Sequence, residues 1–260
     1  MTFKTVQVEN RSDGLIVTLN RPFQNNSING DLLLELNHVL DLAERDDACR
    51  LLVIEGQRGV FCTGLDFEAF ASSYANAGSI PEIEQASQFA ETLKRISKTE
   101  KIIVCKVDGL VMAGGVGLIA ASDLVVATPC SKFSLSETLW GLLPAMVIPY
   151  LIRRVGYHNA YRMTLTTLPV TAKRGGEIGL VDEVSETPDD SIERLWCRLK
   201  CVESNTVKRV KRYFHRMYMI TPEMEKMAVE ETVNLLKSEE VSEKIRNFIE
   251  YQRLPWEDSS

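Results

Sequence analysis

Short apolar runs recur through the first two thirds of the chain and predict a series of strands. Thr5–Val8 and Leu15–Leu19 flank the turn residues Ser12-Asp13-Gly14, a pattern that predicts a β-hairpin. The later runs are almost entirely apolar, as in strands that are buried on both faces. These runs are Leu51–Ile54, 102–107 and Leu124–Ala127, with a further strand expected at 179–184.

Helical periodicity fills the intervals between these strands. Apolar residues recur at helical spacing after Asn29 and Asp31, either of which can cap the helix, and again over residues 81–97. The small polar residues of Ser72–Ile80 predict a mobile segment. Beyond Pro149 the pattern is mainly helical. Strands alternating with helices, followed by helices almost alone, predict an α/β body with a helical C-terminal third.

The composition sets limits on partners and location. With 260 residues, 45% of them hydrophobic and 25% charged, the chain is long enough for one large domain with a substantial core. Its net charge of −6 argues against generic nucleic-acid binding. Six cysteines without CxxC spacing, and no signal-peptide pattern at residues 1–4, predict a reducing, cytoplasmic location. No apolar run reaches membrane-spanning length, and the three histidines are too dispersed to indicate a metal site.

The most informative segment is Ala113–Asp123, which follows the apolar run 102–107. It reads Ala-Gly-Gly-Val-Gly-Leu-Ile-Ala-Ala-Ser-Asp and predicts a strand leading into a glycine-opened helix. The first N–H groups of a helix have no partner inside it, and glycine lets a ligand approach them closely. The spacing is not that of a dinucleotide or phosphate loop. We interpret this helix start as a receptor for a carbonyl that becomes an oxyanion, with close helix–strand packing as the alternative.

Glu137 is the strongest candidate for acid–base chemistry. In Phe133-Ser134-Leu135-Ser136-Glu137, a period of two places Glu137 on the same face as Phe133 and Leu135. A carboxylate on an apolar face is partly desolvated, which raises its pKa and suits it to proton transfer. The alternative is a strand that has already reached solvent, with Glu137 capping a helix from Thr138. The sequence alone leaves both interpretations open.

Asp66 and a basic run near the C-terminus carry weaker signals. Asp66 precedes a short helical pattern and, taken alone, is best interpreted as its N-cap, with a second acid or base as the alternative. Lys208–Arg212 with Arg216 is best interpreted as a solvated helix face. Its alternative is a contact with a phosphate-bearing carrier.

Five motifs follow one another along the chain. They are Asn25-Asn26-Ser27-Ile28-Asn29, Phe61-Cys62-Thr63-Gly64-Leu65-Asp66, Ala113-Gly114-Gly115-Val116-Gly117 through Asp123, Phe133-Ser134-Leu135-Ser136-Glu137 and Gly141-Leu142-Leu143-Pro144. In order and spacing they resemble the crotonase, or enoyl-CoA hydratase/isomerase, superfamily as far as about Glu183. The ending Arg253–Asp258, with 133–137 and Leu151–Arg154, is similar to the dehydratases of polyketide β-branching cassettes.

The resemblance implies a crotonase-like ββα spiral over residues 1–200 and a helical oligomerisation region over 201–260, which joins protomers into a homotrimer or a dimer of trimers. It implies a thioester substrate whose oxygen binds an oxyanion hole made by the backbone N–H groups of Leu65 and Gly114. Further substrate contacts are expected from Arg21, Gly64, Gly115 and Gly141. The expected partner is an acyl carrier protein bearing a phosphopantetheine thioester, or else coenzyme A. No metal, redox cofactor, nucleic acid or membrane is expected.

One departure from the family pattern shapes the expected chemistry. Fatty-acid hydratases of this family carry two glutamates, and Glu137 matches one of them, whereas Gly117 stands at the position of the other. Asp66, in the loop that supplies Leu65, is the expected replacement. We therefore expect Asp66 and Glu137 to catalyse dehydration of 3-hydroxy-3-methylglutaryl-acyl carrier protein to 3-methylglutaconyl-acyl carrier protein. The resemblance does not order their roles as acid and base.

Two alternatives fit part of the pattern. A Δ3–Δ2 enoyl-CoA isomerase would need only Glu137 to move one proton between C2 and C4. A non-catalytic crotonase fold would serve as a scaffold or an RNA binder. The Gly114-Gly115 pair, the two acids and the negative net charge favour an enzyme over that second alternative.

Overall fold

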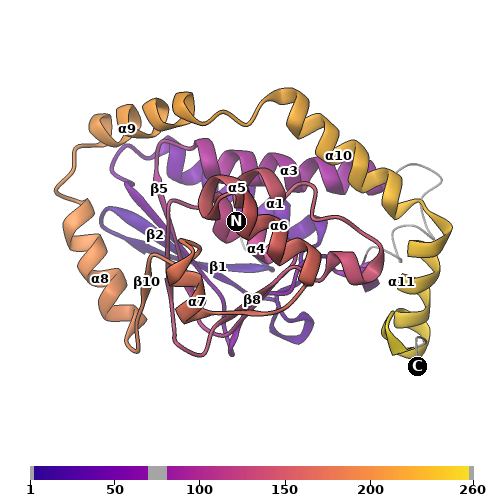
Figure 1. Cartoon of the computed structure of the whole chain (residues 1–260). Coiled ribbons are helices and arrows are strands. Elements are labelled where there is room, and N and C mark those ends of the chain that lie inside the picture. Colours follow the sequence, from indigo (N-terminus) through magenta and orange to yellow (C-terminus); the bar gives the residue numbers. More distant parts are fainter. Residues whose placement is uncertain (1–2, 70–80, 258–260) are drawn as a thin grey trace.

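A six-stranded sheet forms the centre of the computed structural model, which describes residues 3–69 and 81–257 (Figure 1). The segment that was expected to be mobile, Ser72–Ile80, lies outside the described residues. The strand order is β1-β2-β3-β5-β7-β10, with an antiparallel hairpin at β1 and β2 and parallel pairing from β2 onward. These strands are β1 (Val6–Arg11), β2 (Gly14–Leu19), β3 (Leu51–Glu55), β5 (Ile102–Val107), β7 (Leu124–Ala127) and β10 (Glu183–Val184).

A second, four-stranded sheet contains strands that the sequence pattern did not predict. Its order is β4-β6-β8-β9, and each strand has only two or three residues, too few to show a period. The strands are β4 (Val60–Cys62), β6 (Leu110–Met112), β8 (Lys132–Ser134) and β9 (Val170–Thr171). Each of β3, β5 and β7 in the large sheet is followed by one strand of the small sheet. This alternation confirms the ββα spiral.

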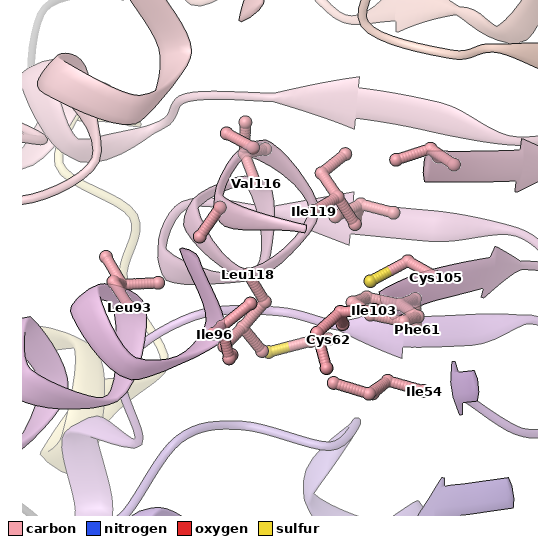
Figure 2. Packing of buried hydrophobic residues seen from close by; sticks show 14 of the residues in the cluster. Ile54, Phe61, Cys62, Leu93, Ile96, Ile103, Cys105, Val116, Leu118 and Ile119 are labelled. Carbon is pink, nitrogen blue, oxygen red and sulfur yellow. The ribbon is translucent and has the colours of Figure 1, made fainter. Parts of the chain in front are cut away.

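The main hydrophobic core lies against three helices, α1 (Gly30–Arg45), α3 (Pro81–Lys98) and α4 (Gly114–Ala121). Asn29 caps α1, since its side-chain oxygen accepts a hydrogen bond from the Leu32 N–H at 2.9 Å. Figure 2 shows residues of α3 and α4 packed with residues of β4 and β5, namely Leu93, Ile96, Val116, Leu118, Ile119, Phe61, Cys62, Ile103 and Cys105. The two buried cysteines act there as small hydrophobic side chains.

The remainder of the chain is mainly helical, as predicted. α8 covers the opposite face of the large sheet, while α9 and α10 follow α3 (Figure 1). The first turns of α11 pack against the short 3-10 helix η2. The strand expected at 179–184 is confined to Glu183–Val184. The helices are α5 (Ile148–Val155), α6 (Tyr157–Thr166), α7 (Ala172–Glu177), α8 (Pro188–Leu199), α9 (Ser204–Met217), α10 (Pro222–Leu236) and α11 (Glu239–Tyr251), with 3-10 helices η1 (Pro22–Gln24) and η2 (Glu137–Trp140). None of the described helices is both long and apolar enough to cross a membrane.

Candidate active site

The start of α4 presents an unpaired backbone N–H group to a cavity. Ala113 adopts a left-handed φ of 48° before the helix, and its own N–H donates to the Ser134 carbonyl oxygen at 2.9 Å. The next residue, Gly114, lines the cavity. Its N–H donates to no acceptor among the described residues, as expected for the first position of a helix.

A second N–H group comes from the loop that follows β4. Ile28 bridges this loop, because its N–H donates to the Gly64 carbonyl at 2.6 Å and its carbonyl accepts from the Asp66 N–H at 3.0 Å. In extended chain, successive N–H groups point in opposite directions, so the Leu65 N–H faces away from Ile28. Leu65 also lines the cavity, and within residues 3–69 and 81–257 its N–H has no acceptor.

Close packing of two glycines brings these N–H groups to the same place. Gly64 has a φ of 85°, and a Cβ atom added to it would lie 3.1 Å from the Gly114 nitrogen and 2.6 Å from the Ala113 Cβ. The loop therefore rests directly on the first turn of α4, and only glycine fits at this contact. Leu65 and Gly114 form a candidate oxyanion hole, as the resemblance implied.

The cavity has a volume of about 590 Å³, within the range of small-molecule sites, and its walls are mainly apolar. Four predicted site residues line it: Leu65, Asp66, Gly114 and Glu137. Among the further lining residues, Ser27, Leu254 and Trp256 belong to motifs that carry the family resemblance, although no site role was expected for them. Lining residues outside those motifs include Phe23, Gln85, Phe89, Trp140, Thr232 and Phe248. They come from separate segments that only the fold brings together, so no local pattern indicated them.

Glu137 is the desolvated carboxylate of the site. β8 ends at Ser134, so the strand expected to reach Glu137 stops three residues earlier, and Glu137 opens η2 instead. Its side chain nevertheless lines the cavity, and its Oε2 atom is buried without a hydrogen-bond partner among the described residues. Burial raises the pKa of Glu137 from 4.5 to about 7. A carboxyl group with this pKa can both take and give a proton near neutral pH.

Asp66 differs from Glu137 in having a partner for each oxygen. Its Oδ1 accepts from the Ala69 N–H at 2.9 Å, the geometry of an N-cap, and its Oδ2 accepts from the Arg21 guanidinium at 2.6 Å. Burial alone would raise the pKa of Asp66, but the hydrogen bonds from Ala69 and Arg21 and the charge of Arg21 hold it below its usual value. Asp66 is therefore ionised at neutral pH.

Arg21, Gly64, Gly115 and Gly141 do not line the cavity among the described residues. Arg21 donates to Asp66 and to the Ser27 carbonyl. Gly115 packs on β4, since an added Cβ would meet the Cys62 carbonyl oxygen at 2.5 Å, and Gly141 ends η2 with a φ of 79° beside α11. Direct substrate contact by these four residues stays a prediction.

Gly117 shows why a second glutamate has no place in α4. A Cβ atom at Gly117 would lie 2.9 Å from Val147 Cγ2 and 3.3 Å from the Phe89 ring. Apolar side chains thus fill the space beside this position. Any second polar group in the cavity must come from another element, such as the loop that carries Asp66.

Positive charge is lacking from the cavity wall. None of the described lining residues is Lys, Arg or His, and residues 70–80 and 258–260 contain none of these types in the sequence. The basic run on α9 lies elsewhere, where Lys211 pairs with Asp123 at 2.7 Å and Lys208 pairs with Glu100 at 2.9 Å. No cluster of three potential metal ligands occurs within the described part of the chain.

The family model for enoyl-CoA hydratase/isomerase matches residues 10–259. The chain belongs to this family. It is therefore an enzyme of the hydratase and dehydratase type, a hydro-lyase with the crotonase fold. The backbone N–H groups of Leu65 and Gly114, which have no acceptor among the described residues, and the desolvated Glu137 make up its candidate site.

Individual relatives agree with this assignment. The bacillaene synthase dehydratase PksH of Bacillus subtilis is 28% identical over 258 residues, which cover 99% of this crotonase and 98% of PksH. The crystal structure of PksH, described as a polyketide biosynthesis enoyl-CoA hydratase, superposes with a TM-score of 0.90 over 98% of this chain and 100% of PksH. The 2,3-dehydroadipyl-CoA hydratase of Escherichia coli is 31% identical over 175 residues, or 65% of each chain.

Proposed function

We propose that this crotonase removes water from 3-hydroxy-3-methylglutaryl-acyl carrier protein and releases 3-methylglutaconyl-acyl carrier protein, a step of polyketide β-methyl branching. The observation that carries the proposal is that a single cavity holds two backbone N–H groups without an acceptor and a desolvated carboxyl group whose Oε2 has no partner, among the residues that the structure describes. The full-length similarity to a polyketide synthase dehydratase supports this substrate class over fatty-acid intermediates.

The candidate oxyanion hole lowers the barrier to removal of the C2 proton. The thioester oxygen accepts hydrogen bonds from the Leu65 and Gly114 N–H groups, which stabilise the negative charge that forms on it. Loss of one such donor typically costs about 3 kcal/mol of transition-state stabilisation. Two donors therefore make an enolate accessible to a base as weak as a carboxylate.

Glu137 is the group that moves protons in this proposal. As a carboxylate it removes the C2 proton, and the electron pair of the C–H bond passes to the thioester oxygen as an enolate. When the enolate collapses, the C2–C3 double bond forms and the C3–O bond breaks. Glu137 returns its proton to the departing hydroxyl group, which leaves as water. Its pKa of about 7 suits both transfers.

Asp66 contributes as a fixed anion rather than as a proton carrier. Its pKa lies below the usual range, so it stays ionised, and its contact with Arg21 would oppose protonation. In the cavity it can still accept a hydrogen bond from the C3 hydroxyl of the substrate. Asp66 would thereby orient the leaving group towards Glu137.

The far carboxylate of the substrate has to be bound without a cation, because no Lys, Arg or His lines the cavity among the described residues. Gln85 of α3 and Thr232 of α10 are polar residues of the wall. We propose that neutral donors of this kind bind the carboxylate. Neutral hydrogen bonds to a charged group contribute roughly 1.5–3 kcal/mol each.

The decisive experiment supplies the protein with 3-hydroxy-3-methylglutaryl thioesters on an acyl carrier protein and on coenzyme A. Mass spectrometry is expected to show the loss of one water, about 18 Da, with faster turnover of the carrier-bound form. The matched control is the same substrate without protein. Absence of water loss from both thioesters would contradict the proposal.

A Δ3–Δ2 enoyl-CoA isomerase is the second candidate, because Glu137 is unpaired whereas Asp66 is committed to Arg21. An isomerase would convert a 3-enoyl thioester to the 2-enoyl form without a change of mass. Supplying both substrate types in parallel distinguishes the two activities. A faster rate with the 3-enoyl thioester would favour the isomerase.

We further propose that the enzyme works in the cytoplasm as a trimer or a pair of trimers. Large apolar side chains on α9 and in the turn after it support self-association, since they are exposed in the single chain. They are Tyr213, Phe214, Met217 and Met219.

A further inference from the structure

The cavity opens to solvent beside Phe23, whose side chain is 85% exposed although it lines the cavity. Its ring is a large apolar surface that a ligand can pack against at the mouth of the cavity. The guanidinium of Arg58 lies over the ring, 5.7 Å from its centroid, in a cation–π contact. An aromatic surface and a cation thus stand together at the rim of a cavity whose wall has no cation.

The backbone fixes this pair in place. Arg58 has a φ of 57° and Gly59 a φ of 74°, inside a turn closed by reciprocal hydrogen bonds between Gln57 and Val60 of 3.1 and 3.2 Å. A left-handed conformation costs a residue with a Cβ atom roughly 1–2 kcal/mol, and such turns favour Asn or Gly at this position. Arg58 is therefore held at the rim at a cost in backbone strain.

One side chain ties the Arg58 turn to the segment that carries Phe23. The Asn26 Nδ2 donates to the Val60 carbonyl at 3.1 Å, and its Oδ1 accepts from the Arg21 N–H at 2.9 Å. Phe23 and Arg58 are thus held together by more than their own contact. This arrangement gives the rim a preformed geometry, which lowers the entropic cost of binding a ligand there.

Charge distinguishes the rim from the interior of the cavity. The described lining residues include the acidic residues Asp66, Glu68 and Glu137 but no cation. Within the described residues, the cavity wall can therefore offer an anionic group hydrogen bonds from neutral donors but no ion pair. Arg58 is exposed, and no carboxylate of the described residues forms an ion pair with it, in contrast to Arg21.

We infer that Phe23 and Arg58 form the outer binding site for the carrier arm of the substrate, in which Arg58 binds the phosphate of phosphopantetheine and Phe23 packs against the apolar pantoyl part. The inference rests on the proposed thioester function. Both coenzyme A and a loaded acyl carrier protein contain this phosphate, so the site recognises the chemistry that they share. The acyl group then extends from the rim towards Glu137.

The test measures binding separately from turnover. Butyryl-pantetheine and butyryl-phosphopantetheine differ only in the phosphate, and neither has a hydroxyl group to lose. With Arg58→Gln, calorimetry is expected to show about tenfold weaker binding of the phosphorylated ligand and unchanged binding of the other. Arg198→Gln, which removes an exposed arginine on α8, is the matched control and should change neither. Equal losses for both ligands, or no loss for either, would overturn the inference.

Two further variants separate the roles of the pair. Phe23→Ala is expected to weaken both butyryl ligands by the same factor, because it removes apolar contact and no charge. Arg58→Gly relieves the left-handed strain, so the melting temperature should rise while the phosphate-dependent part of the affinity is lost. A lower melting temperature with that variant would contradict the strained geometry.

Steady-state kinetics with both thioesters test whether Arg58 binds the phosphate of acyl carrier protein, of coenzyme A, or of both. With 3-hydroxy-3-methylglutaryl on acyl carrier protein and on coenzyme A, Arg58→Gln should raise KM about tenfold for both and leave kcat unchanged. A larger rise with the carrier protein would indicate that Arg58 also contacts the protein. If butyryl-phosphopantetheine binds in an Arg58-dependent way but no thioester is dehydrated, the proposed function fails and the binding site stands.

Discussion

The two turns that place acidic side chains in the cavity give them opposite electrostatic environments. The loop after β4 surrounds Asp66 with the Ala69 N–H and the Arg21 guanidinium, whereas the start of η2 leaves Glu137 Oε2 buried without a partner among the described residues. The pKa of Asp66 is consequently lowered and that of Glu137 is raised to about 7. Two carboxyl groups whose environments separate their pKa values in this way have different roles in proton transfer.

The difference arises from the residues that surround each turn. Arg21 lies two residues beyond β2, next to the loop, and its side chain is only 12% exposed, so its charge acts on Asp66 with reduced screening by water. Glu137 follows the buried Leu135, and Trp140 packs at the other end of η2. The apolar surroundings desolvate the Glu137 carboxylate, and no described cation forms an ion pair that would compensate for this. A reactive acid needs this kind of unfavourable environment.

The largest effect should come from removing each carboxyl group in turn. Glu137→Gln eliminates the proton carrier, so kcat is expected to fall by roughly 10²–10⁴. Asp66→Asn keeps an oxygen for the Ala69 N–H and loses only the charge beside Arg21, so kcat should fall by about 10² or less. Single-turnover kinetics with the carrier-bound substrate provide the measurement.

The outcome of these two variants bears directly on the role of Asp66. Equal losses in the two variants would mean that Asp66 also transfers a proton. An unchanged rate with Asp66→Asn would instead favour the isomerase.

The sequence predicted the large sheet better than the small one, for a physical reason. β3 and β5 are buried on both faces, so their apolar runs are visible without knowledge of any neighbour. β4 and β6 have three residues each and exist because they pair with one another. Such short strands depend on tertiary contacts that leave no periodic pattern in the chain.

The same limit applies to the site. The glycine-opened helix and the desolvation of Glu137 could be predicted, because each depends on adjacent residues. The ion pair of Arg21 with Asp66 joins positions 45 residues apart, and Phe23 meets Arg58 only because the fold brings two turns together. The strand expected through Glu137 was wrong, since alternation of apolar and polar residues does not show where a strand ends.

The pH dependence should report one of the two carboxyl groups and not the other. Glu137 has to be deprotonated to take the C2 proton, so kcat/KM is expected to fall below pH 7, by about fiftyfold between pH 7 and pH 5. Asp66 stays ionised throughout this range, so it adds no second titration step to the pH–rate profile. A pH–rate profile of kcat/KM measures this, and a profile that is flat from pH 5 to 8 would contradict the assignment of Glu137 as the base.

The smallest effect concerns stability, and its sign differs between the two turns. The pKa of Glu137 is higher in the folded chain than its ordinary value of 4.5, so the folded state loses stability as the pH rises from 4.5 through 7. Glu137→Gln removes this loss and should raise the free energy of unfolding by about 3 kcal/mol at pH 8, with no gain at pH 4. The pKa of Asp66 is lowered on folding, so its ionised form stabilises the fold at neutral pH. Asp66→Asn should therefore destabilise the protein by about 1–2 kcal/mol at pH 8.

Urea denaturation of both variants and the wild type at pH 4 and pH 8 measures these changes. If the free energy of unfolding at pH 8 changed in the same direction for both variants, the prediction would be contradicted. The paired Asp66 and the unpaired Glu137 Oε2 would then not affect stability in opposite ways. Opposite signs would show that the reactive carboxyl group lowers stability, while the paired one contributes to it.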